Sequence, residues 1–198
     1  VSIGHPDDSL KNLLAMLSKQ GVERSHCSGF QASPGLDSVD PGVDAALGDF
    51  HARGLLITEI SGLKGRAICL NPLRPSLHQR FAPEAFFRIK FSKFVRIDPC
   101  ADGLEISTPA APGSLLLLDQ RLFPLLMVLV SPCTEDSIRQ CLPKDLLMHC
   151  ADLMSLLLTS GVAGVCNDHG VADIDQTAVD SGWTEQDLAF HCHTRNHT

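Results

Sequence analysis

A leucine-rich run between residues 144 and 159 constrains the fold more than any other feature of the chain. Its apolar side chains recur every three or four residues, as they do on one side of a helix, and Gly161 follows as a typical helix end. A helix with so wide an apolar stripe must be buried against a second layer, so the run predicts the central helix of a core. The stripe consists of Leu146, Leu147, Cys150, Leu153, Met154, Leu157 and Leu158.

Three short segments upstream predict that second layer. Residues 87–91 alternate apolar and polar side chains, which is typical of a strand with one buried face, and the apolar residues 94, 95 and 97 shift phase, which predicts a bulge or bend near Lys93. Residues 104–108 and 114–118 each follow a turn, and the four consecutive leucines at 115–118 favour a strand covered on both faces. We therefore expect a three-stranded antiparallel sheet followed by three helices, which lie near residues 120–130, 134–142 and 144–159.

The first part of the chain predicts a separate, winged-helix-like module. Apolar stripes at residues 10–17 and 43–50 predict two helices, and a glycine-containing turn between residues 55–60 and 66–70 predicts a β-hairpin. The proline-containing stretch 71–84 predicts a linker, because proline removes a backbone donor. The expected fold class is α+β, with tandem winged-helix-like modules. Its parts are a module at 1–73, a module at 85–170 that closes with a short strand or wing at 162–168, and a tail at 171–198.

The charge balance argues against binding to nucleic acid. The chain has 16 lysine and arginine residues against 23 aspartate and glutamate residues, for a net charge of -7. Phosphate recognition requires clustered basic side chains. A winged-helix transcription factor would also need a basic recognition helix, but the helix at 144–159 sets Lys144 against Asp145 and Asp152. We expect no nucleic-acid partner.

Cysteine usage and hydropathy predict a cytoplasmic protein. The eight cysteines form no CxxC pair and several interrupt apolar runs, so we expect reduced thiols in a reducing compartment. The longest apolar stretch, residues 122–130, is too short to span a bilayer and contains Pro124. The first residues lack the pattern of a signal peptide. We expect no membrane partner.

Candidate reactive groups are few, and each has a simpler interpretation. His191, Cys192, His193 and His197 are suitable zinc ligands by type, but an interdomain tail explains them better because carboxylates that could orient them are absent nearby. Cys166 and His169 lack a second ligand pair, and Cys27 follows His26 directly, where the two side chains rarely face each other. The glycine turn at 62–65 joins two strands and is not a phosphate loop. We predict no catalytic, metal-binding or cofactor-binding residue in the chain.

Three stretches resemble parts of a known family. Residues 86–168, with three strands and then three helices, resemble the PqqD-like recognition element of ribosomal peptide natural-product pathways. Residues 183–195, which read WTEQDLAFHCHTR, resemble the segment that joins such a front portion to the flavin domain of SagB-type azoline dehydrogenases. Residues 70–73, which read LNPL, resemble the junction between the two front modules of that family.

The resemblance implies a non-catalytic front portion of a SagB-type dehydrogenase. The family's reaction is FMN-dependent oxidation of thiazolines and oxazolines to thiazoles and oxazoles, and it belongs to a nitroreductase-like domain that the resemblance does not cover. The family's tail continues through a glycine into that domain, whereas this sequence reads Asn196-His197-Thr198. We expect no cofactor in this chain, and FMN only where the missing domain is present. Either a fragment of a longer dehydrogenase or a truncated protein would fit.

The same resemblance implies a peptide-binding site. In recognition elements of this type a leader peptide adds as a strand beside the third strand and packs on the third helix, where an open strand edge supplies affinity. The residues implied in peptide binding are Ser114, Leu115, Leu116, Leu117 and Leu118 on the strand and Asp145, His149 and Asp152 at the rim.

Three hypotheses about function follow from the resemblance. The first is leader-peptide recognition and assembly in the biosynthesis of azole-containing ribosomal peptides, with the precursor peptide and a flavin dehydrogenase domain or a cyclodehydratase subunit as partners. The second is a degenerate docking or dimerisation module, which makes a homodimer possible. The third is a fragment of an active FMN-dependent oxidoreductase.

Overall fold

The computed structural model describes residues 53, 57–73 and 87–195 of the chain. Apart from Arg53, these residues belong to one compact unit that spans residues 54–198. They form a five-stranded antiparallel sheet, a two-stranded sheet and several helices, which confirms the expected mixture of α and β structure. The helices predicted at 10–17 and 43–50 lie outside the described residues, so the winged-helix arrangement stays a prediction.

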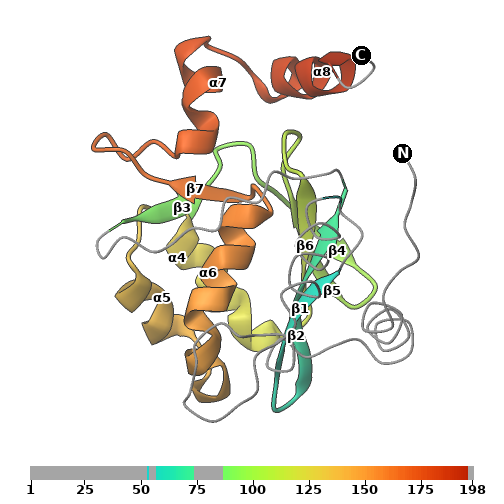
Figure 1. Ribbon diagram of the computed structural model, residues 1–198, viewed down its shortest axis with the longest axis vertical. Helices are drawn as coiled ribbons and strands as arrows, with labels where there is room; N and C mark the ends of the chain where they lie inside the picture. Colours follow the sequence, from blue (N-terminus) through green and yellow to red (C-terminus); the bar gives the residue numbers. More distant parts are fainter. Residues whose placement is uncertain (1–52, 54–56, 74–86, 196–198) are drawn as a thin grey trace, which may run out of the picture. The chain divides into compact units, whose positions relative to one another are not determined.

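The larger sheet has the strand order β1-β2-β6-β5-β4 (Figure 1). Its central strand, β6, pairs with β2 on one side and with β5 on the other. The hairpin between β1 and β2 turns at Leu63 and Lys64, after which Gly65 has a φ of 102°, a backbone conformation that favours glycine. The strands are β1 Thr58–Gly62, β2 Gly65–Pro72, β4 Arg96–Cys100, β5 Gly103–Ser107 and β6 Gly113–Leu117.

Alternate residues of this sheet form one continuous apolar face. Leu117 of β6 is paired with Ile68 of β2 and with Leu104 of β5, so apolar side chains follow one another across three strands. Leu115 and Leu117 are fully buried, and Ile68 is 1% exposed. This face is where the main core of the described unit forms.

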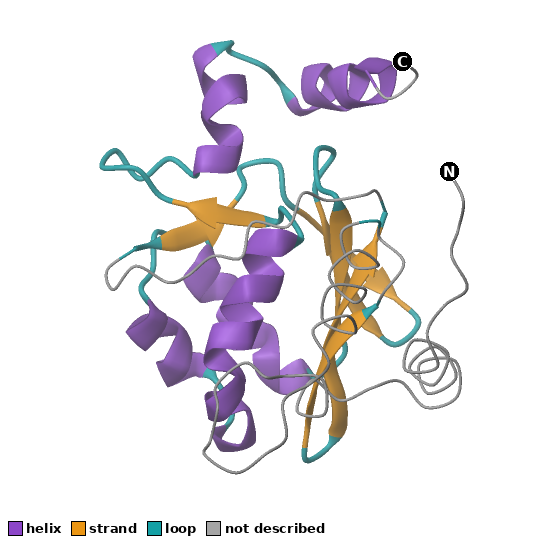
Figure 2. Cartoon of the chain, in the orientation of Figure 1, coloured by secondary structure: helices purple, strands orange, loops and turns teal. Residues whose placement is uncertain are grey.

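A helical layer lies beside this sheet (Figure 2). It begins where the Asp119 carboxylate accepts a hydrogen bond from the backbone N–H of Arg121, and the Thr134 hydroxyl accepts one in the same way from Ser137 at the next helix. The helix predicted at 144–159 is a 3-10 segment followed by an α-helix whose apolar stripe is buried. The elements are η1 Gln120–Leu122, α4 Phe123–Leu129, α5 Glu135–Cys141, η2 Lys144–His149 and α6 Cys150–Thr159.

A two-stranded sheet joins segments that are far apart in the sequence. The first strand of the meander was expected to begin at Phe87 and to continue past a bend near Lys93 to Ile97. Its first part was assigned wrongly, because β3 pairs with β7, whereas β4, which contains Ile97, takes the place beside β5. Ile89 and Phe91 are both buried, so the alternation correctly indicates a strand without specifying its partner. The bounds are β3 Ile89–Phe91 and β7 Ala163–Val165.

The segment after β7, predicted as a tail at 171–198, contains three short helical elements. Figure 1 shows α7 and α8 beyond the end of the helical layer that carries β3 and β7. Among the helices that the structure describes, none is long and apolar enough to cross a membrane. The elements are η3 Asp173–Asp175, α7 Gln176–Asp180 and α8 Glu185–Arg195.

Candidate peptide-binding site

The edge of β6, which was expected to be open for a peptide, is closed by the chain itself. Residues Ile68 to Pro72 of β2 pair in sequence with residues Leu117 to Gly113 of β6, so every residue of β6 has a partner on that side. The expectation of an open third strand was therefore wrong. The hairpin that fills this edge comes from residues 58–72, which the sequence had placed in the first module, and it joins the two predicted modules in one sheet.

The five predicted strand residues are mostly inaccessible. Ser114 is 1% exposed and Leu115 and Leu117 are fully buried, while Leu116 and Leu118 are partly exposed. The backbone N–H of Leu118 donates to the carbonyl oxygen of Ala67 at 2.9 Å, which extends the contact with the hairpin past the end of β6. An added peptide strand would need these backbone groups, and they are already used within the chain.

The predicted rim residue Asp145 fastens the hairpin to the helical layer. Its Oδ2 atom accepts a hydrogen bond from the backbone N–H of Leu63, at the tip of the hairpin, at 3.0 Å. Its Oδ1 atom lies 2.8 Å from Nη1 of Arg121, whose Nη2 atom lies 2.6 Å from Oδ2 of Asp119. We call Asp119, Arg121, Asp145 and the Leu63 N–H the hairpin latch.

The electrostatics of the hairpin latch favour its charged form. Hydrogen bonds from the Arg121 guanidinium and then from the Leu63 N–H lower the pKa of Asp145 to about 2. Hydrogen bonding to Arg121 also lowers the pKa of Asp119, and the two carboxylates together raise the pKa of Arg121. Both carboxylate side chains are only 10% exposed, and Arg121 is 29% exposed, so this network is better shielded from solvent than an ordinary surface ion pair.

Close approach between the hairpin and η2 requires a glycine. A Cβ atom at Gly62 would lie 2.7 Å from Oδ2 of Asp145 and 2.9 Å from Cδ2 of Leu146. Contacts this short do not occur between real Cβ atoms and their neighbours, so a Cβ at residue 62 would force either the Asp145 and Leu146 side chains or the hairpin to shift.

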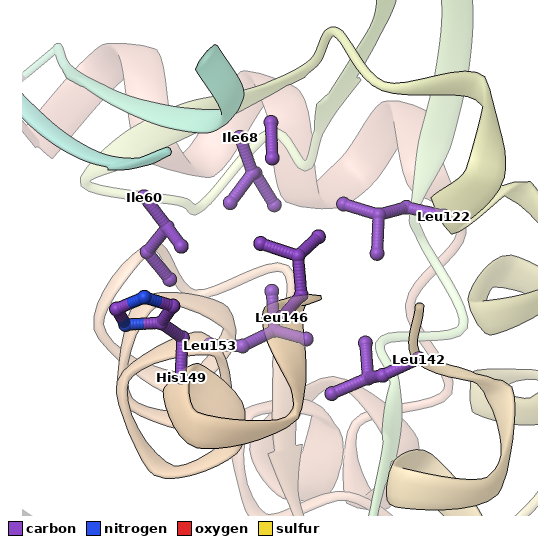
Figure 3. Close-up of a pocket in the computed structure, with 8 residues that line it drawn as sticks. Ile60, Ile68, Leu122, Leu142, Leu146, His149 and Leu153 are labelled. Carbon is purple, nitrogen blue, oxygen red and sulfur yellow. The ribbon is translucent and has the colours of Figure 1, made fainter. Parts of the chain in front are cut away.

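Of the other two rim residues, His149 lies beside the hairpin, and Asp152 lies next to His149. His149 and Asp152 approach each other across one turn, with 3.6 Å between Nδ1 and Oδ2. Figure 3 shows the His149 imidazole next to Ile60 of β1, around a cavity lined also by Leu146. This cavity measures about 10 Å³, which is at the lower limit for one water molecule, so the hairpin and the helices are packed together here.

Two outer strand edges of the large sheet have no strand partner among the described residues. One belongs to β4, whose five residues are all exposed and include Pro99, a residue that cannot donate to a further strand. The other belongs to β1, which lies against η2 through the contact between Leu63 and Asp145. Of the two, only β1 stands next to the predicted rim residues.

The buried cysteines are held as neutral thiols. Burial raises the pKa of Cys133 to about 11 and also raises the pKa of Cys69 and Cys150. For Cys69 burial outweighs the hydrogen bond from the Arg66 guanidinium, whose Nη2 atom lies 3.0 Å from Sγ. The thiolate is the reactive form, so none of these three is a suitable nucleophile at neutral pH.

The described side chains bring no set of metal ligands together. Within residues 57–73, 87–176 and 178–190, where side chains are described, no three His, Cys, Asp or Glu residues come together to hold an ion. The side chains of His191, Cys192 and His193 are not described, and His197 lies outside the described residues. Cys166 is partly buried while His169 is exposed.

Sequence reasoning missed the partners that make the hairpin latch. Arg121 joins Asp119 to Asp145, which lies 24 positions after Arg121, and no local pattern indicates such a contact. No family model matches the sequence, and no curated protein matches it either.

Proposed function

We propose that the chain is a non-catalytic assembly module in the biosynthesis of azole-containing ribosomal peptides, and that it docks a flavin dehydrogenase domain or a cyclodehydratase subunit without capturing a leader peptide along β6. The resemblance of residues 183–195 to the segment that precedes the flavin domain of SagB-type dehydrogenases supports the choice of partner. FMN and the oxidation of thiazoline or oxazoline belong, in this proposal, to the partner domain.

The observation that carries the proposal is the pairing of β2 with β6 over five residues. A peptide that adds to a sheet gains its affinity from main-chain hydrogen bonds to an unpaired edge. Here the hairpin makes those bonds, and the hairpin latch holds its tip against η2. A leader peptide would have to displace both, which favours the docking role over the recognition role at this strand.

The test uses the 198-residue chain, fluorescent leader peptides, and the separately produced flavin domain and cyclodehydratase subunit. We expect light scattering after size exclusion to show a complex with the flavin domain. Where fluorescence polarisation detects a bound leader peptide, we expect the β2–β6 pairing to stay closed. The same scattering measurement reports whether the free chain is a homodimer. Leader binding accompanied by loss of amide protection at residues 68–72 would contradict the proposal, and so would failure to bind both the flavin domain and the cyclodehydratase.

The outer edge of β1 favours a second candidate function, leader recognition at a displaced position. In the resembling elements the peptide lies between a strand edge and the third helix, and here β1 occupies the place next to η2 while Asp145, His149 and Asp152 remain nearby. Hydrogen exchange measured with and without leader peptide separates the two candidates. A gain of amide protection at residues 58–62, with the amides of β4 unchanged as the internal control, supports recognition at β1. If the leader peptide causes no such gain, docking is the one candidate function left.

A further inference from the structure

A cavity of about 250 Å³ lies away from the hairpin, where the end of β5, the end of α6 and the segment from η3 to α8 come together. Its polar lining comes from Ser92, Thr108 and Asp175, and its apolar lining includes Ala110, Ile174 and Leu188. The three polar residues are 5%, 8% and 2% exposed. Such a cavity is far larger than one water molecule needs and slightly smaller than the usual pocket for a drug-sized ligand, which starts at about 300 Å³.

Asp175 is the unusual member of this lining. Its Oδ1 atom accepts a hydrogen bond from the Ser92 hydroxyl at 2.6 Å, and its Oδ2 atom accepts one from the backbone N–H of Lys93 at 2.7 Å. These bonds tie the loop after β3 to η3. A carboxylate can accept about four hydrogen bonds, so the two bonds use about half of its capacity.

The buried carboxylate also has no cationic side chain beside it in the described part of the chain. The ion pairs of that part join other acids to arginine or histidine, and the Lys93 ammonium lies over the ring of Phe94, 4.6 Å from its centroid. Buried charges are normally paired, because removing a carboxylate from water is costly. A structural tie between two loops explains the two hydrogen bonds, but it does not explain why the acid borders a cavity.

We propose that this cavity binds a small organic ammonium group that carries an apolar body. The ammonium would pair with Asp175 and donate to the Thr108 hydroxyl, whose own contact with the carbonyl oxygen of Gly161 is long, at 3.4 Å. The apolar body would lie against Ile174 and Leu188. The same chemistry is available from a free alkylamine and from a lysine side chain of a peptide, and the volume suits either one.

The experiment titrates the full chain with n-butylammonium, followed by amide chemical shifts, and repeats the titration with 1-butanol, which has the same shape but no charge. We expect millimolar binding of the ammonium and affinity at least about tenfold higher than for the alcohol, because hydrogen bonds to charged groups are the stronger kind. Equal affinity for the two probes, or no shift with the ammonium because the cavity holds water only, would overturn the proposal. A further titration uses Nα-acetyl-lysine methylamide in place of n-butylammonium. Tighter binding of this compound identifies the ligand as a lysine side chain of a peptide.

A pair of matched variants locates the binding. Ala110→Leu places a larger side chain at the cavity from an exposed position, so it should weaken n-butylammonium binding at least about tenfold and leave the fold intact. Ala101→Leu makes the same change at an exposed turn residue that does not line the cavity, and it should leave binding unchanged. Full affinity in Ala110→Leu would refute the assignment. The comparison of ammonium with alcohol in the unaltered chain does not depend on either variant.

Discussion

Truncating one leucine of β6 tests whether the hairpin and the helices enclose this strand as described. Leu117 is fully buried between Ile68 and Leu104, whereas its neighbour Leu116 is partly exposed on the opposite side of the sheet. Leu117→Ala removes buried methyl groups and leaves a cavity, a change that costs about 2–5 kcal/mol. Leu116→Ala makes the same chemical change at a partly exposed position, and we expect it to cost roughly 1 kcal/mol or less.

The assay is urea unfolding of both variants, with thermal unfolding as a second measurement. For a chain of this size each kcal/mol lowers Tm by about 2–4 °C, so Leu117→Ala should lower it by about 4–20 °C. The slope of the urea transition should stay unchanged, because only stability is altered. Equal losses in the two variants would refute the assignment of Leu117 to the buried face, and with it the register between β2 and β6.

Three further predictions concern the hairpin latch and the thiols. The folded-state pKa of Asp145 is lowered to about 2, so its contribution to the free energy of unfolding is present above the unfolded-state pKa, near 4, and is lost as pH falls through about 2. The urea midpoint should therefore fall less between pH 6 and pH 2 in Asp145→Asn than in the unaltered chain. Parallel curves for the two proteins would contradict this. Gly62→Ala should destabilise the chain by roughly 1–3 kcal/mol and speed amide exchange at residues 58–62, because the added Cβ meets Asp145 and Leu146. Unchanged exchange would show that the hairpin tip is not held. Iodoacetamide labelling followed by mass spectrometry should modify the exposed Cys100 in the folded chain but reach Cys69, Cys133 and Cys150 only after denaturation, and early labelling of Cys133 would disprove its burial.

Local sequence patterns predicted the elements that depend on local physics. The apolar stripe of residues 146–158 is buried as expected, and Asp119 and Thr134 begin helices as their hydrogen-bonding side chains allow. The apolar run at 115–118 correctly indicated a strand, and β6 is central in the sheet. Its expected cover on both faces is seen only in part, because Leu115 and Leu117 are fully buried while Leu116 on the other face is partly exposed. Period and capping carry this information because both arise within a few residues.

The parts that failed depend on contacts between distant residues. The end of β4 was assigned to a turn, because its residues are exposed and include Pro99. The pairing of β3 was wrong because its partner β7 lies more than seventy positions along the chain. The open edge of β6 was an inference from resemblance, and residues 58–72 give no local sign that their hairpin would close it. The candidate site inherited this error, since Asp145 and His149 lie against the hairpin.

The covalent link between the hairpin and β6 decides how a free peptide would compete for this edge. A segment tethered through its own chain acts at an effective concentration in the millimolar range. A leader peptide present at about 1 μM would therefore need to bind β6 about a thousandfold more tightly than the hairpin does, a difference of about 4 kcal/mol. Both would form the same kind of main-chain bonds, but only the hairpin also has its tip bound by Asp145. The balance favours the hairpin, so any peptide recognition by this chain has to use a surface other than β6.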